Sequence, residues 1–445
     1  MVQKLIITNF YSVREKVEIS FEASKEKQYN EDWVVSVGNC RLLKAILFYG
    51  ANGSGKTNIL CAFHLLRSII LNIPKEFDEP IQTMPFALDP TFNNRSTKFE
   101  LYFFIEETRY RYFVELTTSR IIQEELWRYS SGKKHQTIFS RKYNEEKGVH
   151  KVRFGAGLLL SVEDRKEIEK STINTISVLS AYASKNISCA ELSVVRDYFK
   201  YRFFQIYTVE DRDQEVAKAL QEDMNLKLLL MDLIRTFHSN IVDIKVSEEI
   251  KQIPEEARQI LLQMRTTPEE RKEIENLHTF KKYKSLYIHK TELGEFPLED
   301  SLQSDGTRNF VRHLVLFYNA IRNNSLVILD EFGTGLQART QHLLLDFFLK
   351  FSKHSQLLFA TQSLGLLDFP IMRRDAIMIV SKNTIGQTSI DSNTVKKIHK
   401  NIRLRKAYAD GRFTTIDPNE PNINLNEHYD KYLSLIYQSR KEECE

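Results

Sequence analysis

A glycine-rich segment near the N-terminus has the residues needed to hold a phosphate group. Residues 50–57 read Gly-Ala-Asn-Gly-Ser-Gly-Lys-Thr, which matches the P-loop pattern at each fixed position. A β-type run ends just before this segment and helical spacing begins at its end, as the motif requires. Backbone N–H groups of such a loop turn inward around phosphate oxygens, and the start of the following helix adds partial positive charge. The residues expected to surround the phosphates are Gly50, Asn52, Gly53, Gly55, Lys56 and Thr57.

Two side chains at the end of this P-loop are expected to act on a nucleoside triphosphate and its metal ion. Lys56 would reach the β- and γ-phosphates, and the Thr57 hydroxyl would be a ligand of Mg²⁺. The alternative is an accidental glycine-rich turn, and the correctly placed strand and helix argue against it.

Two adjacent carboxylates follow a second apolar strand far along the chain. Residues 325–329 read Ser-Leu-Val-Ile-Leu, and Asp330 and Glu331 come next. Successive side chains at a strand end point to opposite sides, so the two acids can have different tasks. Asp330 would bind Mg²⁺ through its hydration shell, and Glu331 would orient and deprotonate the attacking water. An ordinary acidic turn is the competing interpretation, which the P-loop in the same chain weakens.

A third polar segment opens a helix between these two motifs. Residues 304–307 read Ser-Asp-Gly-Thr, and a helix start with Ser and Gly offers exposed N–H groups that can bind an anion. In isolation the segment is an ordinary helix N-cap. Its position between the P-loop and the acidic strand makes Ser304 and Gly306 candidates for contact with nucleotide.

The elements that must position these residues follow an α/β pattern. A buried strand is expected at 45–49, and alternating runs between 85 and 139 indicate a β-rich lobe. Residues 161–278 are expected to be mostly helical, with two amphipathic helices between 254 and 280. Strand and helix alternate again from 298 to 381, as a parallel sheet requires. One helix is expected near 429–438.

Composition limits the class of protein. The 445 residues carry 63 Lys and Arg against 59 Asp and Glu, and this near-neutral balance gives no whole-molecule case for nucleic acid. The four cysteines have no paired spacing, which argues against a disulfide framework or a Cys-based zinc site. No apolar run approaches the ~18 residues of a membrane span, so we expect a cytoplasmic protein without membrane contact. Residues 394–412 are locally basic, which indicates either a solvated helix face or a docking stripe for nucleic acid or a partner.

The ordered set of motifs resembles the ABC-type ATPase heads of SMC, RecF and OLD proteins. More closely, it resembles the AAA-family ATP-binding proteins of bacterial anti-phage defence and abortive-infection loci, such as the Septu, PARIS and AbiL ATPases. The matching residues outside the P-loop and acidic strand are Asn9, Phe10 and Ser12, Pro85 and Phe86, residues 304–307, and Tyr408, Gly411, Arg412 and Phe413.

The resemblance implies a fold and a division into segments. The expected fold class is α/β, an ABC-ATPase-like P-loop head with a mixed sheet and a β-rich N-terminal lobe, plus a helical insertion. The expected segments are the N-terminal part of the head at 1–160, the helical insertion or arm at 161–297, the C-terminal part of the head at 298–390, and a polar, basic extension at 391–445.

The resemblance also implies a mechanism and further site residues. In this superfamily the segment equivalent to 304–307 caps the γ-phosphate of ATP on the P-loop of another subunit, so a homodimer or higher homo-oligomer is expected to form through the heads. Gln82 is the candidate for the Q-loop, and Leu336 occupies the position that crosses the dimer interface. Gln362 stands at the switch position, which is usually His. An amide can bind a γ-phosphate but cannot take up charge, so the hydrolysis rate is open.

Three functions remain open from the sequence. The first is an Mg²⁺- and ATP-dependent ATPase that controls a separate effector, a toxin or nuclease, in phage defence. A separate effector is expected because only about 60 residues follow the last core strand, fewer than a typical domain has. The second is an ATP-binding sensor or scaffold with little turnover, suggested by Gln362. The third is an SMC- or RecF-like DNA-processing ATPase, suggested by the basic residues at 394–412.

Overall fold

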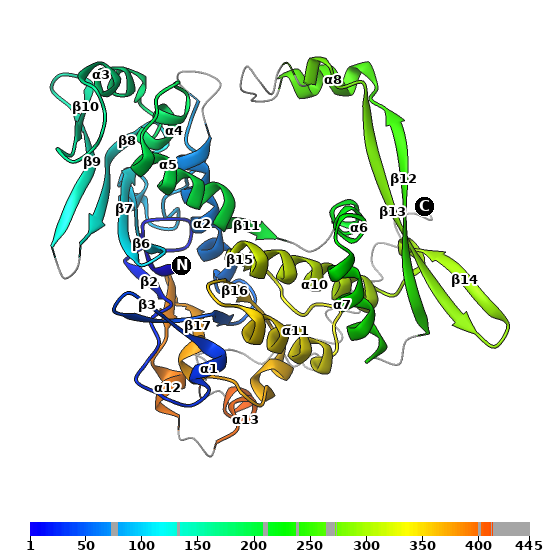
Figure 1. Ribbon diagram of the computed structural model, residues 1–445. Helices are drawn as coiled ribbons and strands as arrows, with labels where there is room; N and C mark the ends of the chain where they lie inside the picture. The colour runs from blue at the N-terminus through cyan, green and yellow to red at the C-terminus, as the bar shows by residue number, and fades with distance from the viewer. Residues whose placement is uncertain are drawn as a thin grey trace, which may run out of the picture.

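The computed structural model describes residues 1–72, 79–130, 134–207, 212–236, 240–263, 272, 274–398, 402–410 and 412. Two large sheets share one continuous hydrophobic core, and an arm projects from the body that they form (Figure 1). The helix expected near 429–438 lies outside the described residues.

The first sheet is the β-rich lobe expected from the sequence. It is antiparallel, with the order β10-β9-β8-β7-β6-β1-β2. Buried and half-buried residues alternate along β7, as they do in a strand that packs one face on a core. Its strands are β1 (Val2–Thr8), β2 (Val17–Ser20), β6 (Thr97–Ile105), β7 (Thr108–Leu116), β8 (Ile121–Tyr129), β9 (His135–Asn144) and β10 (Val149–Phe154).

The second sheet carries the candidate site. Its order is β11-β15-β16-β5-β17-β18, and all neighbouring pairs are parallel except β17 with β18. Every residue of β5, β15 and β16 is buried, which explains their unbroken apolar sequences. The strands are β5 (Ala45–Tyr49), β11 (Phe203–Tyr207), β15 (Leu326–Leu329), β16 (Gln356–Ala360), β17 (Ile377–Lys382) and β18 (Thr388–Asp391). This mixed sheet and the antiparallel lobe confirm the expected fold class.

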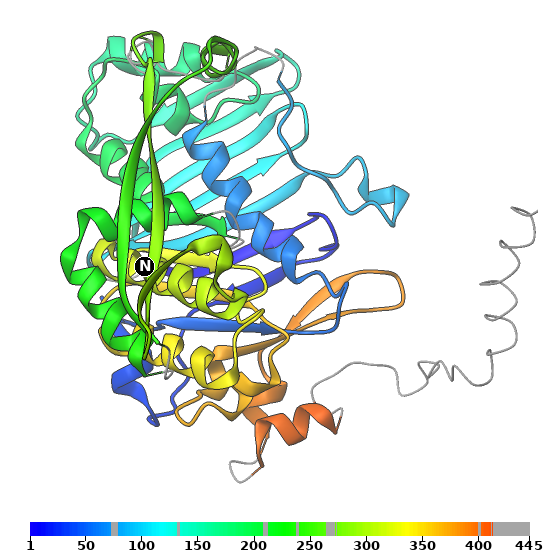
Figure 2. The same cartoon turned by 90° about the vertical axis from the view of Figure 1, so that its right-hand side faces the viewer.

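Helices pack around these sheets. α2 (Lys56–Leu71) follows β5 and crosses the seven-stranded sheet (Figure 2), while α10 (Asp305–Asn323) packs on α11 (Ala338–Phe351). Helices α3 (Val162–Ser171), α4 (Val178–Ala183) and α5 (Ala190–Asp197) lie along the lobe. The remaining small elements are α1 (Asn30–Trp33), β3 (Val34–Val37), β4 (Cys40–Leu43), α6 (Asp213–Glu222), α7 (Met224–Arg235), α12 (Thr394–Lys397) and α13 (Leu404–Ala409).

The arm differs from the expectation of a helical insertion. Its frame is a three-stranded antiparallel sheet of β12 (Ile241–Gln252), β13 (Thr279–Thr291) and β14 (Gly294–Glu299), with α8 (Glu255–Gln263) at the far end. The first of the two amphipathic helices expected between 254 and 280 is present as α8. Residues 161–278 were expected to be mostly helical, and Ile241–Gln252 is instead a strand. The second expected helix lies partly outside the described residues.

The physical reason is the pairing of β12 with β13. The Lys- and Glu-rich sequence of this region looks helical by composition, but Lys281 and Lys284 form cross-strand ion pairs with Glu248 and Glu249. Cross-strand pairs of opposite charge stabilise a sheet, and strand preference depends strongly on such context. The partner strand thus favours a strand at β12 over the helix that the composition suggests.

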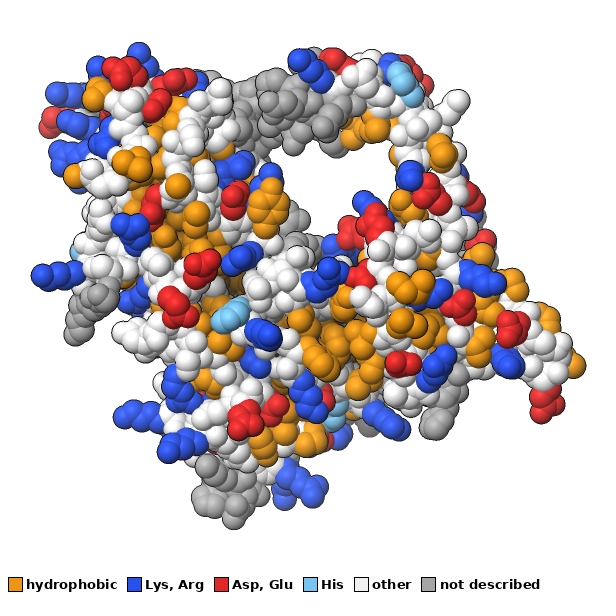
Figure 3. Space-filling model, in the orientation of Figure 1, with side chains coloured by type: hydrophobic (Ala, Val, Ile, Leu, Met, Phe, Trp, Pro, Cys, Tyr) orange, Lys and Arg blue, Asp and Glu red, His pale blue; other side chains and the backbone are white. Residues whose placement is uncertain are grey.

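The surface agrees with the near-neutral composition. Lys and Arg side chains are mixed with Asp and Glu over the face seen in Figure 3. None of the described helices combines the length and the apolar character that a membrane crossing needs.

Candidate functional site

The P-loop depends on two glycines that touch the β17–β18 hairpin. A Cβ atom on Gly50 would lie 2.1 Å from the Val380 carbonyl oxygen. Gly55 has a φ of 101°, and a Cβ there would lie 2.1 Å from Thr388 Oγ1. Because no L side chain fits at either place, both positions require glycine. The loop is thus clamped between β5 and a hairpin that lies far away in the sequence.

The Lys56 ammonium is held inside the curve of this loop. Its Nζ donates to the carbonyl oxygens of Gly50 at 2.8 Å and Ala51 at 2.9 Å. Burial lowers the pKa of Lys56, and the nearby charges of Asp330 and Glu331 oppose that shift. A partly desolvated ammonium in this position can donate hydrogen bonds to phosphate oxygens.

The structure brings the P-loop and the acidic strand together. Thr57 Oγ1 donates to Asp330 Oδ2 at 2.5 Å, although 273 residues separate them in the sequence. A hydroxyl and one carboxylate fit Mg²⁺, which keeps several waters and shares phosphate oxygens of the substrate. Across the described residues no group of three or more His, Cys, Asp and Glu side chains gathers as a dedicated metal cage. The donor set therefore suits a magnesium ion that arrives with a nucleotide.

Glu331 has an unusual backbone conformation. Its φ is 55°, in the left-handed region. This conformation is unfavourable for any residue that has a Cβ atom. The turn is held by Thr334, whose N–H and hydroxyl both donate to the Glu331 carbonyl oxygen, at 3.3 and 3.0 Å. The Glu331 side chain is exposed beyond the end of β15. Strained residues of this kind concentrate at functional sites.

Gln362 lies at the same edge of the sheet. It is exposed and follows β16, which is placed between β15 and β5. The preceding residue, Thr361, donates from its N–H to Phe48 O at 3.1 Å and from its hydroxyl to Phe332 O at 2.8 Å. These bonds fix Gln362 between the strand that carries the P-loop and the strand that carries the acids.

The segment 304–307 forms a capped helix start, as the sequence predicts. Ser304 Oγ accepts from Thr307 N–H at 3.2 Å and caps α10. A Cβ on Gly306 would lie 3.3 Å from Gly335 O, so the segment packs on the loop that follows Glu331. In the part of the chain that the structure describes, no hydrogen bond joins it to the P-loop of the same subunit.

Two residues assigned by resemblance, Gln82 and Leu336, have no hydrogen bond to the P-loop among the described residues. Gln82 is exposed, in a segment whose Met84 carbonyl oxygen accepts from Tyr11 N–H at 2.8 Å. Among the described residues, Gln82 has no hydrogen bond to the P-loop. Leu336 is 9% exposed and belongs to the core of its own subunit.

Sequence reasoning missed a set of hydroxyl contacts behind the P-loop. Asn58 Nδ2 donates to Ser12 Oγ at 2.8 Å, and Thr388 N–H donates to Ser12 O at 2.7 Å. The sequence did point to Ser12, because this residue belongs to the turn that carries the family resemblance. Thr388 had none, because an isolated Thr in a short polar strand does not stand out.

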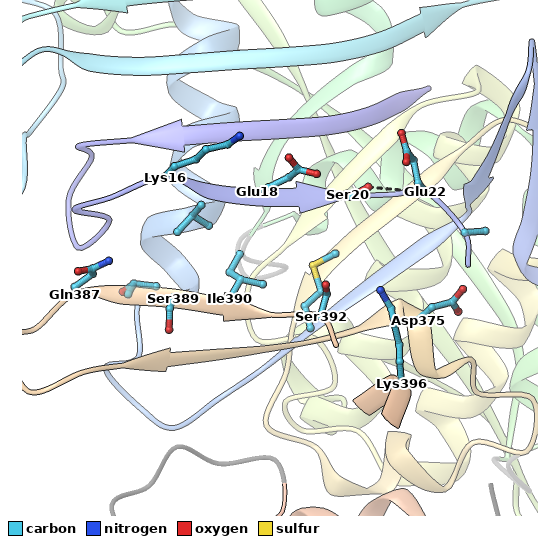
Figure 4. A pocket seen from close by; sticks show the side chains of 14 residues that line it. Lys16, Glu18, Ser20, Glu22, Asp375, Gln387, Ser389, Ile390, Ser392 and Lys396 are labelled. Atoms are coloured by element: carbon cyan, nitrogen blue, oxygen red, sulfur yellow. Dashed lines mark hydrogen bonds between the residues drawn. The ribbon is translucent and has the colours of Figure 1, made fainter. Parts of the chain in front are cut away.

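A cavity of about 490 Å³ lies between the edges of β2 and β18. Figure 4 shows Lys16, Glu18 and Glu22 on one wall and Gln387, Ser389 and Ile390 on the other. Thr388 also lines the cavity, but the P-loop, the acid pair and Gln362 do not. The cavity is therefore separate from the phosphate-binding loop and touches it only through Thr388.

Comparison with known proteins identifies a family for most of the chain. Residues 46–368 match the family described as "AAA domain, putative AbiEii toxin, Type IV TA system". The match covers most of the chain and includes the P-loop, residues 304–307, the acid pair and Gln362. No curated protein matches the chain.

Solved structures of SMC heads are similar only at a distance. The SMC head domain from Thermotoga maritima has 15% sequence identity and a TM-score of 0.41, with 88% of this chain and 98% of that chain covered. An Smc head domain with an extended coiled coil, bound to the C-terminal domain of ScpA derived from Pyrococcus furiosus, has 15% identity and a TM-score of 0.38, with 88% and 95% covered. At this level the likeness carries no argument about the site.

Proposed function

The chain belongs to the family of AAA-domain proteins described as putative AbiEii toxins of type IV toxin–antitoxin systems, and from this premise we propose that it is an Mg²⁺-dependent ATPase that binds ATP between two paired heads. The observation that carries the proposal is the 2.5 Å contact between Thr57 Oγ1 and Asp330 Oδ2. It joins a phosphate-binding loop to a carboxylate at the end of a neighbouring parallel strand.

Each residue of the site has a task in this proposal. The P-loop N–H groups and Lys56 bind the phosphates, while Thr57 and Asp330 hold the magnesium ion. Bound Mg²⁺ would neutralise charge on the β- and γ-phosphates. Glu331, turned out of the strand by its left-handed backbone, orients the attacking water and accepts its proton. Gln362 donates to the γ-phosphate from its amide.

Ser304 and Gly306 act on the ATP of a second subunit. This step is supported by their exposed helix start and by the absence, among the described residues, of any hydrogen bond to their own P-loop. A helix N-terminus binds anions through its N–H groups and its positive end. The site would be complete only when two heads meet.

A mixing experiment tests this arrangement. Lys56→Ala destroys the P-loop half of the site, and Gly306→Asp destroys the capping half by steric and charge repulsion. Neither variant should hydrolyse ATP alone. In a two-fold dimer, an equal mixture should regain about a quarter of wild-type phosphate release, because half the dimers then carry one intact site of two. A mixture as inactive as its components would refute capping between subunits.

The trapped state gives a second test. Glu331→Gln should abolish multiple-turnover phosphate release and accumulate an ATP-bound dimer or higher oligomer, which light scattering after gel filtration detects. Full turnover in a strictly monomeric wild-type preparation would contradict the paired-head proposal.

The biological role that we infer is control of a separate effector, a toxin or nuclease, in anti-phage defence. This role rests on the resemblance of the motifs to ATPases of anti-phage defence loci, and the family description adds a link to a toxin–antitoxin system. Co-expression with the neighbouring open reading frame tests it: the partner should bind the Glu331→Gln trap and wild type to different extents. Equal binding in both nucleotide states would argue against control by ATP.

A sensor with little turnover is the second candidate, because Gln362 replaces a residue that takes up charge. Phosphate release over many turnovers, lost in Glu331→Gln, would exclude it. A DNA-processing ATPase is the third candidate, and it requires salt-sensitive DNA binding at modest ionic strength.

A further inference from the structure

We propose that Thr388 is a positioning residue of the phosphate-binding loop, whose buried hydroxyl holds the loop in the shape that binds ATP. This inference rests on the proposed function, since it concerns the same nucleotide. Thr388 opens β18 and is fully buried. It lies more than 330 residues after the P-loop in the sequence, at 334 residues from Ser54.

The Thr388 hydroxyl touches the loop directly. Its Oγ1 lies 2.8 Å from the Ser54 carbonyl oxygen and 2.8 Å from Ser12 Oγ. Ser12 Oγ in turn accepts from Asn58 Nδ2 at 2.8 Å. The hydroxyls therefore reach the chain on both sides of Lys56, at Ser54 before it and at Asn58 after it.

The Thr388 hydroxyl is the donor that serves two acceptors in this group. Each hydroxyl has a single proton and can also accept, and hydroxyl hydrogens rotate to suit their partners. Asn58 Nδ2 donates to Ser12 Oγ, and the single Thr388 proton lies within hydrogen-bond distance of two acceptors, Ser12 Oγ and Ser54 O. Removal of the Thr388 hydroxyl takes this donor away from both Ser54 O and Ser12 Oγ inside a buried site, which is costly.

Close packing makes the contact specific to the loop. A Cβ on Gly55 would lie 2.1 Å from Thr388 Oγ1 and 2.6 Å from Ser12 Oγ, so these hydroxyls press on the Gly55 backbone. Gly50, at the other end of the loop, rests on Val380 O of β17. The β17–β18 hairpin thus forms a wall behind both ends of the loop.

Loop shape matters because the phosphates are bound largely by backbone N–H groups. N–H groups that already point toward the phosphates lose little conformational entropy when ATP binds. A loop that loses its support behind Ser54 should therefore bind ATP more weakly, while the acid pair and Gln362, which Thr388 does not touch, should work on bound ATP as before.

The test compares Thr388→Val with wild type and with two controls. Valine keeps the branched shape and removes only the hydroxyl. Thr388→Ser keeps the hydroxyl. Thr172→Val removes another buried hydroxyl, which bonds to Ile168 O at 2.7 Å in the lobe. ATP affinity is measured by titration calorimetry, KM and kcat by phosphate release, and melting temperature by calorimetry.

Thr388→Val should raise the Kd and KM for ATP roughly tenfold, the effect of losing about one buried hydrogen bond, with kcat changed less than about twofold. Thr388→Ser should recover most of the affinity, and Thr172→Val should bind ATP like wild type even where it melts earlier. A Thr388→Val protein with wild-type affinity, or an equal loss in Thr172→Val, would overturn the inference.

Two further outcomes are separated by the same experiment. If Thr388→Val does not fold, Ser12→Ala interrupts the same hydroxyl chain, and wild-type affinity in that variant would overturn the inference. If wild type itself does not bind ATP, the proposed function fails and this inference fails with it. Wild-type binding with an unaffected Thr388→Val removes only the positioning role.

Discussion

The left-handed backbone of Glu331 leads to a prediction about stability that is independent of catalysis. Its φ of 55° places a residue with a Cβ where glycine is preferred. The conformation is held from outside, by the two hydrogen bonds from Thr334 and by the buried Phe332, whose N–H donates to Ala360 O at 2.9 Å. We therefore expect the backbone to be strained at Glu331, and this strained conformation sets the position of the carboxylate.

The comparison that isolates this strain is Glu331→Gly against Glu331→Ala. Both variants lack the carboxylate and should be inactive, so they differ only in the backbone preference at this residue. A left-handed residue with a Cβ costs about 1–2 kcal/mol, and the greater freedom of glycine in the unfolded chain offsets about 0.5–1 kcal/mol of this. The glycine variant should be more stable than the alanine variant by about 1 kcal/mol.

This difference can be converted into a melting temperature. An unfolding entropy of about 2.1 cal/mol/K per residue, over 445 residues, gives about 0.9 kcal/mol/K. The glycine variant should melt about 1 °C above the alanine variant in differential scanning calorimetry, with both measured side by side without nucleotide. Glu331→Gln keeps the side chain length and should melt close to wild type.

The result that would refute this reasoning is a glycine variant that melts at or below the alanine variant. The left-handed turn would then carry no strain in the free protein. A gain in stability together with full phosphate release would instead refute the assignment of Glu331 as the base.

The remaining predictions concern the loop, the metal and pH. Gly55→Ala should abolish ATP binding in calorimetry, because its Cβ would overlap Thr388 Oγ1 and because φ is 101°; a variant that binds ATP normally would show that the loop can move aside. Thr57→Val should raise the Mg²⁺ concentration needed for half-maximal phosphate release at least tenfold, whereas an unchanged requirement would remove Thr57 from the metal site. Burial lowers the pKa of His313 to about 4. The unfolded chain binds the proton first, so stability should be complete above pH 6.5 and fall by at most about 3 kcal/mol as the pH drops to 4. Melting curves of His313→Phe over this pH range should lack the part of the stability loss that is due to His313. An equal dependence of stability on pH in both proteins would contradict this prediction.

The sequence by itself determined the features that depend on neighbouring residues. The P-loop is readable because eight consecutive residues, a preceding apolar strand and a following helix make one local unit. The N-cap at Ser304 and the buried strands β5, β15 and β16 were predictable for the same reason, since capping and apolar runs act over a few residues.

Only the tertiary structure decided which distant residues meet. Thr57 and Asp330 are in contact because the parallel order β15-β16-β5 brings two strand ends to one edge. Thr388 reaches the P-loop because β17 pairs with β5 and the chain then turns back as β18, which carries Thr388. The arm formed strands where its composition suggested helix, because pairing between β12 and β13 overrode the helix preference of Lys and Glu. Secondary-structure preferences depend on short stretches of sequence, whereas pairing between strands depends on residues that come together only when the chain folds.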